Sequence, residues 1–313
     1  MENNGSVIVT TAQKILTQVR KAVVGKDPVL LWVLAAILAQ GHILLEDIPG
    51  VGKTTMALAF SRALGLEYNR LQFTPDVLPS DITGYSVLDQ ATGNLVYKPG
   101  AVLCNLFLAD ELNRATSRTQ SALLEAMEEG QVTVDGISHQ LPDAFTVIAT
   151  QNPAGAAGTQ LLPDSQMDRF MVRLSLGYPD PKDEVTMLMQ RQGREPLKEV
   201  EPVLTVGELT QLQQIVDRTH VSEEIAQYVV DLVDATRRSD MILRGGSPRA
   251  TLATVAMAKA VAQLRGRDYV IPKDVQEVFI STVAHRIHAA PGNDSAEELL
   301  RELMGTIHPP KLR

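Results

Sequence analysis

The chain has 313 residues, of which 44% are hydrophobic and 21% are charged, and its formal net charge is −8. This composition is typical of a globular protein, and it excludes both a disordered tail protein and a collagen-like fibre. The acidic balance, with an isoelectric point near 5.3, disfavours sequence-independent binding to phosphate backbones. We therefore expect no nucleic-acid partner.

The sequence contains no segment suited to a membrane. Its longest unbroken apolar run covers the eleven residues 29–39, whereas a membrane-spanning helix needs about 20. The first residues show neither the basic cluster nor the apolar core of a signal peptide. We expect a cytoplasmic protein with no membrane span. The single cysteine, Cys104, excludes an intramolecular disulfide and a cysteine-based zinc site.

Short apolar runs alternate with helical patterns through the first half of the chain. This alternation predicts an α/β fold, in which helices cover the faces of a mostly parallel sheet. Asp27 and Pro28 predict a helix start, since Asp can cap free N–H groups and Pro fits the first turn. Ser117 and Gln120 have capping-box spacing, and Gly130 ends the helix that they begin. The expected strands are 42–46, 68–73, 106–109, 145–150 and 171–176.

The pattern changes at Pro179 and Pro181, because neither proline can donate a ladder hydrogen bond. Beyond them the sequence favours helices, and the last two expected helices run to about residues 265 and 288. We predict two domains, an α/β core over residues 1–178 and a smaller all-helical lid over residues 179–313. The expected helix starts are Thr205 with its capping-box partner Glu208, Ser222, Ser247-Pro248 and Pro272.

The first expected strand runs into a glycine-rich loop and then into a helical pattern. Gly50 and Gly52 have no Cβ, so the backbone N–H groups of this loop can turn inward around a phosphate. The following helix directs its partially positive N-terminus at the same point. Lys53 supplies a mobile charge for the β- and γ-phosphates of ATP, and the Thr54 hydroxyl can ligate Mg²⁺.

One position of the loop departs from the usual pattern, which begins with glycine, because Asp47 stands there. The alternative interpretation is a glycine-rich turn with an incidental lysine. The strand, the loop, the helix and the Gly-Lys-Thr run occur together, however, and this combination favours a site for ATP and Mg²⁺. The loop residues predicted to bind nucleotide are Pro49, Gly50, Val51, Gly52, Lys53, Thr54 and Thr55.

Two carboxylates, Asp110 and Glu111, end the buried strand expected at 106–109. At the carboxyl end of a strand both side chains can reach the crevice where ligands bind. Asp110 would hold the Mg²⁺ shell, and Glu111 would polarise the water that attacks the γ-phosphate. The strand at 145–150 leads to Asn152, whose amide would help to place the same water. An ordinary Asn-Pro turn is the alternative for Asn152.

The phosphate loop, the acidic pair and Asn152, in this order, resemble an AAA+ ATPase with Asn152 as its first sensor. Two longer regions narrow the likeness to the MoxR family. The first is RLQFTPDVLPSDITG at residues 70–84, and the second combines ADELNR at 109–114 with TQSALLEAMEE at 119–129. The resemblance covers nearly the whole chain, and in this family Asp47 also occurs at its position.

The resemblance implies a homo-oligomeric ring, usually a hexamer, with the ATP site between subunits. Arg169 matches the arginine finger, which reaches the γ-phosphate of the neighbouring subunit, and an arginine fork suits phosphate oxygens. Structural pairing of Arg169 with Asp164 or Asp168 is the alternative. Arg249 matches the second sensor, or it is a solvated arginine near a helix start. The pair Val24-Gly25 matches the segment that contacts adenine.

The resemblance also implies a chaperone-like function, in which ATP turnover remodels or activates a partner protein, often one with a von Willebrand factor type A domain. Two expected hairpins, at 85–97 and 131–140, would contact such a client or would simply cover a sheet edge. The alternatives are a nucleic-acid motor, a metal-chelatase-type motor subunit and a nucleotide switch without hydrolysis. The acidic composition disfavours the nucleic-acid motor, and Glu111 disfavours the switch.

Overall fold

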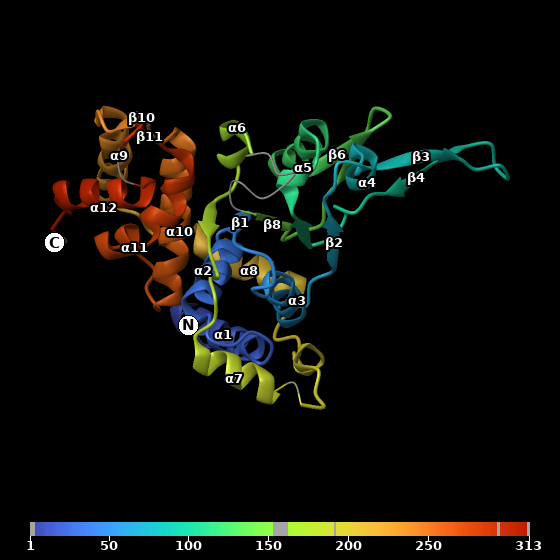
Figure 1. Ribbon diagram of the computed structural model, residues 1–313, viewed down its shortest axis with the longest axis horizontal. Helices are drawn as coiled ribbons and strands as arrows, with labels where there is room; N and C mark the ends of the chain where they lie inside the picture. The colour runs from blue at the N-terminus through green and yellow to red at the C-terminus, as the bar shows by residue number, and fades with distance from the viewer. Residues whose placement is uncertain (1–3, 153–161, 191, 293–294, 312–313) are drawn as a thin grey trace.

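A five-stranded sheet forms the centre of the α/β part of the molecule (Figure 1). The computed structural model describes residues 4–152, 162–190, 192–292 and 295–311 of the chain. The strands follow the order β2-β5-β8-β1-β9, and every neighbouring pair is parallel. The predicted α/β fold is therefore confirmed. The strands are β1 (Ile43–Glu46), β2 (Tyr68–Gln72), β5 (Leu106–Asp110), β8 (Thr146–Gln151) and β9 (Val172–Leu174).

Side chains of the central strands alternate between the two faces of this sheet, since successive residues of a strand point to opposite sides. Leu106 and Leu108 of β5 pack into one hydrophobic core, while Phe107 and Ala109 pack into a second one. Ile148 of β8 joins the first core. Both faces are buried, which is why these strands read as unbroken apolar runs in the sequence.

Helices from the first half of the chain cover the two faces. α1 and α3 contribute to the first core, and α5 contributes to the second, where it packs beside α4. A short 3₁₀ turn (Leu112–Arg114) links β5 to α5. The bounds of these helices are α1 (Asn4–Arg20), α2 (Asp27–Leu38), α3 (Lys53–Ala63), α4 (Pro79–Thr83) and α5 (Ser117–Glu129).

Both expected hairpins form. β3 (Gly84–Leu88) pairs with β4 (Leu95–Pro99), and β6 (Gln131–Val134) pairs with β7 (Ile137–Gln140), both antiparallel. The β3–β4 hairpin extends away from the body of the molecule (Figure 1). Tyr97 of β4 stacks on His139 of β7, with ring centroids 3.7 Å apart, so the second hairpin braces the first.

The described residues beyond β9 are mainly helical, as expected. An antiparallel pair of short strands, β10 (Ile242–Arg244) and β11 (His288–Ala289), is an addition that the sequence pattern did not predict. The first core runs from α1 through α10 to α12, so the division at residues 178 and 179 stays a prediction. The helices are α6 (Asp164–Met167), α7 (Pro181–Gln190), α8 (Val206–Asp217), α9 (Glu223–Arg238), α10 (Pro248–Leu264), α11 (Pro272–Val283) and α12 (Ala296–Thr306), with a 3₁₀ turn at Pro196–Glu199.

Helix caps follow the sequence at most of the expected positions. Thr205 forms a capping box with Glu208, and Ser222 and Ser247 cap α9 and α10 with their hydroxyls. Gly130 ends α5 in the left-handed conformation, with φ of 63°. These local signals identify helix boundaries because the capping group lies within a few residues of the groups that it satisfies.

Two expected caps are wrong. Thr116 caps α5, because its backbone is extended and its hydroxyl accepts from the Thr119 amide, whereas Ser117 is already helical. Asp27 lies inside the first turn of α2, and its carboxylate pairs with Arg20 at 2.7 Å instead of capping the helix.

The helix that begins at Pro272 ends at Val283, not near residue 288 as expected. A 3₁₀ turn (Ala284–Arg286) follows it. There the buried His285 ring lies 2.9 Å from the Phe170 carbonyl, and Arg286 donates to the same oxygen at 2.5 Å. The chain leaves the helix because these two side chains bind the loop before β9.

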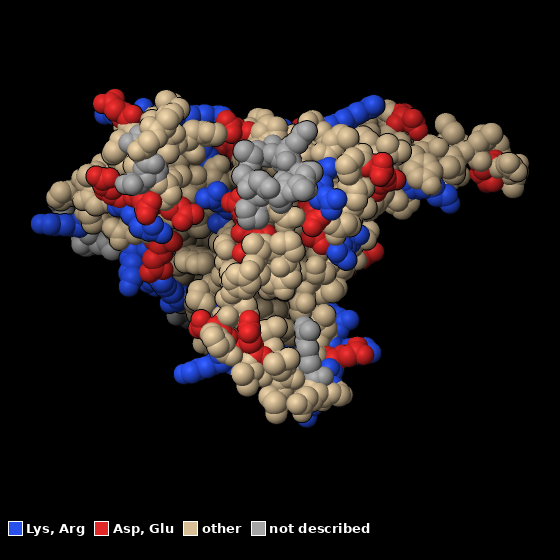
Figure 2. Space-filling view, viewed as in Figure 1, with Lys and Arg blue, Asp and Glu red and all other residues tan. Residues whose placement is uncertain are grey.

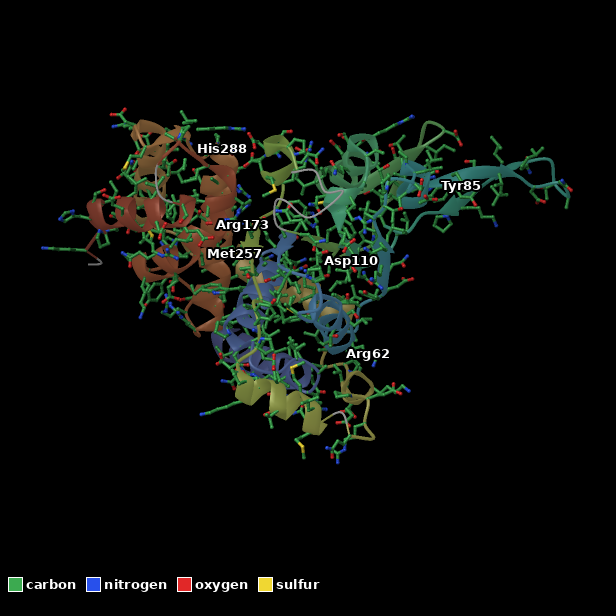
Figure 3. All side chains as sticks on the ribbon, in the orientation of Figure 1. Arg62, Tyr85, Asp110, Arg173, Met257 and His288 are labelled. Atoms are coloured by element: carbon green, nitrogen blue, oxygen red, sulfur yellow. The ribbon has the colours of Figure 1, made fainter. Side chains whose placement is uncertain are left out.

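Side chains fill the α/β body and the helical part, while those of the β3–β4 hairpin stand out from both (Figure 3). Asp110 lies in the body, Tyr85 lies on the hairpin, and Met257 and His288 lie in the helical part. Within the described ranges, no helix is long and apolar enough to cross a membrane.

Candidate functional site

A glycine-rich loop joins the end of β1 to the start of α3. Gly50 and Gly52 have φ of 88° and 98°, in the left-handed region that glycine adopts without strain. A Cβ added at either position would meet no atom within 4 Å, so the space beside these glycines is open. No acidic side chain lies in the first turn of α3. The loop and the helix start form a cradle suited to a phosphate group.

The Asp47 carboxylate fixes the beginning of this loop. Asp47 is buried and accepts hydrogen bonds from the Ser175 hydroxyl at 2.8 Å, from the Leu176 amide at 2.6 Å and from the Gly177 amide at 3.0 Å. These three donors follow β9, the neighbour of β1 in the sheet. The residue that departs from the usual phosphate-loop pattern therefore ties the loop to the segment after β9.

Lys53 is buried beneath the loop, and its ammonium donates to the carbonyls of Asp47 at 2.8 Å and Ile48 at 3.0 Å. Burial lowers the pKa of this ammonium, and the nearby carboxylates of Asp47, Asp110 and Glu111 oppose that shift. Because β1 and β5 both flank β8 in parallel, the loop with Lys53 and the acidic pair leave the sheet at the same edge, as a shared phosphate site requires.

Asp110 ends β5, and both of its carboxylate oxygens are engaged. Thr150 of β8 donates its hydroxyl to one oxygen at 2.7 Å, and Arg70 of β2 donates to the other from Nε at 3.1 Å and from a terminal nitrogen at 2.7 Å. The three residues come from three adjacent strands. Because Asp110 is only 8% exposed, the pairing with Arg70 offsets the cost of burying its charge.

Glu111 has a left-handed backbone with φ of 56°, which is uncommon for a residue with a Cβ. Its amide donates to the Thr150 hydroxyl at 2.8 Å. One carboxylate oxygen accepts from the Asn152 side chain at 3.3 Å, and the other pairs with Arg114 at 2.7 Å. Glu111 and Asn152, which the sequence analysis predicts to act on the same attacking water, are thus hydrogen-bonded to each other.

The segment with Val24 and Gly25 lies against the start of α7. Gly25 has φ of 71°, and a Cβ added there would lie 1.9 Å from Oδ2 of Asp183. The next residue, Lys26, is buried and donates to the Tyr178 carbonyl at 2.7 Å. The residues that follow β9 therefore contact both this segment and the phosphate loop.

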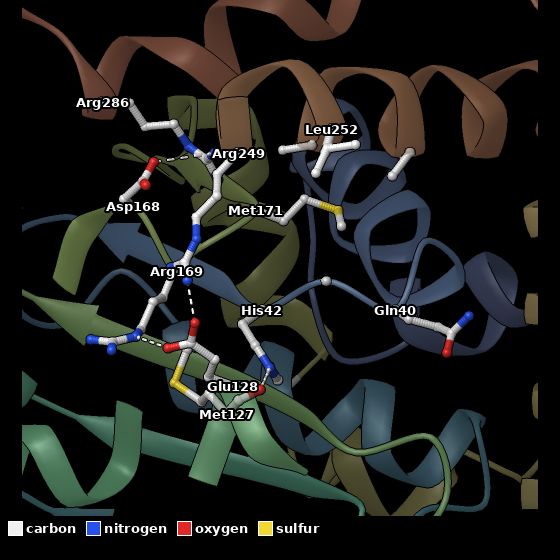
Figure 4. Close-up of a pocket in the computed structure, with 13 residues that line it drawn as sticks. Gln40, His42, Met127, Glu128, Asp168, Arg169, Met171, Arg249, Leu252 and Arg286 are labelled. Atoms are coloured by element: carbon white, nitrogen blue, oxygen red, sulfur yellow. Dashed lines mark hydrogen bonds and ion pairs between the residues drawn. The ribbon is translucent and has the colours of Figure 1, made fainter. Parts of the chain in front are cut away.

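Arg169 lies at the opposite edge of the sheet, since it comes shortly before the start of β9, and Figure 4 shows Arg249 close to it. His42, directly before β1, makes a hydrogen bond to the Met127 carbonyl at 3.2 Å. The next residue, Glu128, pairs with Arg169 at 2.9 Å and with Arg249. Because the phosphate loop follows the carboxyl end of β1, the structure does not bring these two arginines to the phosphate loop of their own subunit.

The sequence analysis gave Asp164 and Asp168 as alternative partners of Arg169, but both carboxylates bind other residues. Asp164 pairs with Arg244 at 2.5 Å, and Asp168 accepts from the Ser247 hydroxyl at 3.0 Å. Arg169 is therefore paired, but with a carboxylate that the sequence analysis did not consider.

The side chains around the phosphate cradle fit a magnesium ion. Mg²⁺ prefers oxygen ligands, and the two predicted ligands offer the hydroxyl of Thr54, in the first turn of α3, and the carboxylate of Asp110. An ionised carboxylate has lone pairs beyond those that Thr150 and Arg70 occupy, so these bonds leave Asp110 able to hold the ion's water shell.

Sequence reasoning did not assign Thr150 or Arg70 to the site. Both residues are nevertheless unusual in the sequence, and this could have pointed to a role in the site. Thr150 is a hydroxyl residue in an otherwise apolar strand, and Arg70 is a charged residue in the middle of an expected strand. Only the strand order places both beside Asp110, and the sequence does not reveal that order. Arg70 and Arg114 were noted only as parts of family motifs.

Comparison with known proteins gives matches over both parts of the chain. The description "ATPase family associated with various cellular activities (AAA)" matches residues 42–172, and "AAA lid domain" matches residues 234–303. The chain is 43% identical to "Uncharacterized protein YeaC" of Bacillus subtilis over 96% of this chain and 95% of that protein.

Two further similarities are informative about activity. The chain is 37% identical to "Chaperone MoxR1" of Mycobacterium tuberculosis, over 97% of this chain and 84% of that protein. A solved structure named "putative ATPase" from Cytophaga hutchinsonii is 33% identical and superposes with a TM-score of 0.91 over 99% of this chain and 98% of the other.

The first prediction concerns Asp47. Asp47→Gly restores the usual phosphate-loop pattern but removes an acceptor of three hydrogen bonds, so we expect ATP affinity to fall at least about tenfold. Ser175→Ala, which removes one of the three donors, should cause a smaller loss. Titration of a fluorescent ATP analogue measures both variants. Wild-type affinity in Asp47→Gly would contradict the anchoring role.

Proposed function

The chain belongs to the MoxR family of AAA+ ATPases, and we propose that it couples ATP hydrolysis to the remodelling or activation of a partner protein. The family supports nucleotide binding and ATPase activity, and the reaction that we propose converts ATP and water into ADP and phosphate. One observation carries the proposal: the phosphate loop with Lys53 and the acidic pair lie at the carboxyl ends of parallel strands, at one edge of the sheet, whereas Arg169 and Arg249 meet at the other edge.

In the proposed reaction, water attacks the γ-phosphate and ADP leaves. Glu111 polarises that water, and the hydrogen bond from Asn152 orients the Glu111 carboxylate. Lys53 balances the negative charge of the β- and γ-phosphates. Mg²⁺, when bound, neutralises further phosphate charge, and Thr54 and Asp110 are the residues that would hold it.

The two arginines serve the nucleotide of a neighbouring subunit in this proposal. β1 has four residues, which at about 3.3 Å each separate the two edges of the sheet by roughly 13 Å. An arginine at the amino edge therefore does not complete the site at the carboxyl edge of its own sheet. A homo-oligomeric ring, which we propose to be a cytoplasmic hexamer, places one edge of each subunit against the other edge of the next.

The extended hairpin is the proposed contact for the client protein. Its exposed apolar residues are Tyr85, Leu88, Leu95 and Val96, and the β6–β7 hairpin braces it through the stack of Tyr97 on His139. Apolar side chains on a protruding element favour contact with another protein. By family resemblance, we propose that the client carries a von Willebrand factor type A domain.

The alternative functions have less support. On the face drawn in Figure 2, Lys and Arg side chains are interspersed with Asp and Glu instead of forming one basic stripe, which disfavours a nucleic-acid motor. The similarity to "Chaperone MoxR1" covers 97% of the chain, which favours the chaperone-like function over that of a metal-chelatase motor.

The second prediction concerns the catalytic carboxylate. Glu111→Gln keeps the shape but removes the base, so ATP should still bind while phosphate release falls at least about a hundredfold. Lys53→Ala should instead lose ATP binding, because a charge that contacts the phosphates is gone. Glu125→Gln, an exposed carboxylate on α5, is the matched control. Turnover near the wild-type rate in Glu111→Gln would assign the base to another residue.

The third prediction concerns the trans-acting arginine. Arg169→Ala should bind ATP but hydrolyse it at least about a hundredfold more slowly. Mixing it with Glu111→Gln subunits, which still carry Arg169, should give ATPase activity above that of either parent. The measurement is phosphate release from the mixture at constant total protein. Full activity of Arg169→Ala by itself would refute the assignment.

The fourth prediction concerns the client. Replacing Leu88 and Leu95 by Ser should leave basal ATPase unchanged, since no catalytic group lies on the hairpin, but should weaken client binding or ATPase stimulation. Thr92→Ala at the same turn is the control, because it changes no exposed apolar side chain. A salt series with nucleic acid completes the test. Tight binding with a steep salt dependence, together with stimulated ATPase, would favour the nucleic-acid motor.

A further inference from the structure

One carboxylate holds both arginines at the amino edge of the sheet. Glu128 accepts from Nε of Arg169 at 2.9 Å through one oxygen, and it pairs with a terminal nitrogen of Arg249 through the other. The arginines come from distant parts of the chain, the loop before β9 and the first turn of α10, and Glu128 comes from the end of α5. Figure 4 shows the three side chains converging.

The electrostatics of the two helices explain why these charges meet. Glu128 and Glu129 lie in the last turn of α5, where a negative charge is unfavourable because the helix end is itself partially negative. Arg249 lies in the first turn of α10, where a positive charge is unfavourable for the opposite reason. Pairing offsets both costs. Accordingly, hydrogen bonding to Arg169 and the charge of Arg249 lower the pKa of Glu128.

Only the Nε of the Arg169 guanidinium makes a hydrogen bond to a described residue. Glu128 binds only its Nε, and the two terminal nitrogens point away from the carboxylate in Figure 4. No other described residue makes a hydrogen bond to those nitrogens. They are the pair of donors that matches two oxygens of a phosphate group.

The backbone around the two arginines is fixed independently of Glu128. The Ser247 hydroxyl, which caps α10 two residues before Arg249, donates to both oxygens of Asp168 at 3.0 Å. Asp168 directly precedes Arg169 and also lies 3.5 Å from Arg286. The two arginines therefore keep neighbouring attachment points, and Glu128 determines how their side chains are aligned.

We propose that Glu128 is the positioning residue for the arginines that act on the neighbouring subunit's nucleotide: it holds Arg169 and Arg249 side by side and turns the fork of Arg169 outward, toward the incoming γ-phosphate. Without Glu128 the two guanidinium groups repel each other, and both side chains lose their alignment. The proposal rests on the proposed trans role of Arg169.

Mixed rings of the full-length chain test this proposal. Arg169→Ala subunits supply intact Glu111 sites, and Glu111→Gln subunits supply the arginines. Glu128→Ala is added either to the subunit that supplies the arginines or to the subunit that supplies the site. We expect kcat of the mixed rings to fall at least about tenfold in the first placement, and to change by less than about twofold in the second. KM for ATP should change little in either.

Two controls accompany the mixed rings. Glu129→Ala, a neighbouring carboxylate on the same helix end, should have no effect in the first placement. Glu128→Gln keeps the shape of the side chain and one acceptor oxygen, so it should give an intermediate loss of kcat in the first placement. It replaces Glu128→Ala in the test if that variant folds poorly.

Three outcomes would overturn the positioning role. Equal losses in both placements would indicate a merely structural residue. A higher kcat in the first placement would indicate that Glu128 restrains the arginines instead of aligning them. Mixed rings that show no activity above their parents, even with Glu128 intact, would refute the trans role itself, and the positioning role with it.

Discussion

The parallel pairing of β1 with β8 and β9 is the constraint on which both halves of the proposed site depend. In a parallel sheet all carboxyl ends meet at one edge, so β1, β5 and β8 deliver the phosphate loop, the acidic pair and Asn152 to the same place. The amino ends meet at the other edge, where the loop before β9 presents Arg169. In the proposed mechanism the sheet therefore separates the phosphate loop and the acidic pair from the two arginines, and this separation favours assembly between subunits.

Within the carboxyl edge, one hydroxyl sets the position of both carboxylates. Thr150 donates to Asp110 and accepts from the Glu111 amide. The left-handed backbone of Glu111 costs about 1–3 kcal/mol, and the hydrogen bond from its amide helps to offset that cost. The turn that results directs the Glu111 carboxylate toward Asn152 and away from the strand axis. A buried threonine without catalytic chemistry of its own thus helps to define the geometry of the two acidic residues.

Three carboxylates of the proposed machinery have arginine partners. Arg70 pairs with Asp110, Arg114 pairs with Glu111, and two arginines share Glu128. Arginine stays protonated throughout the physiological range, so these pairs persist where a histidine partner would titrate. Asp110 is the most buried of these carboxylates, so removing Arg70 leaves a buried charge uncompensated, which costs more free energy than the pair contributes. The arginines are therefore part of the architecture of the site as well as of its chemistry.

The sequence by itself determined the five strands of the central sheet, the two hairpins, the glycine-rich loop and most helix boundaries, because these depend on residues close together in the chain. One of its errors was also local: Ser117 was expected to cap a helix that Thr116 caps, since both residues offer a hydroxyl and only the backbone conformation distinguishes them. Others depended on distant contacts, such as the end of α11, where His285 and Arg286 bind the Phe170 carbonyl. Only the tertiary structure decided which side chains meet. Arg70 and Thr150 each lie 40 residues from Asp110, and Glu128 lies 41 residues from Arg169 and 121 from Arg249. Such contacts depend on the order of the strands and on how α10 packs against α1 and α2, and no local pattern of residues encodes either.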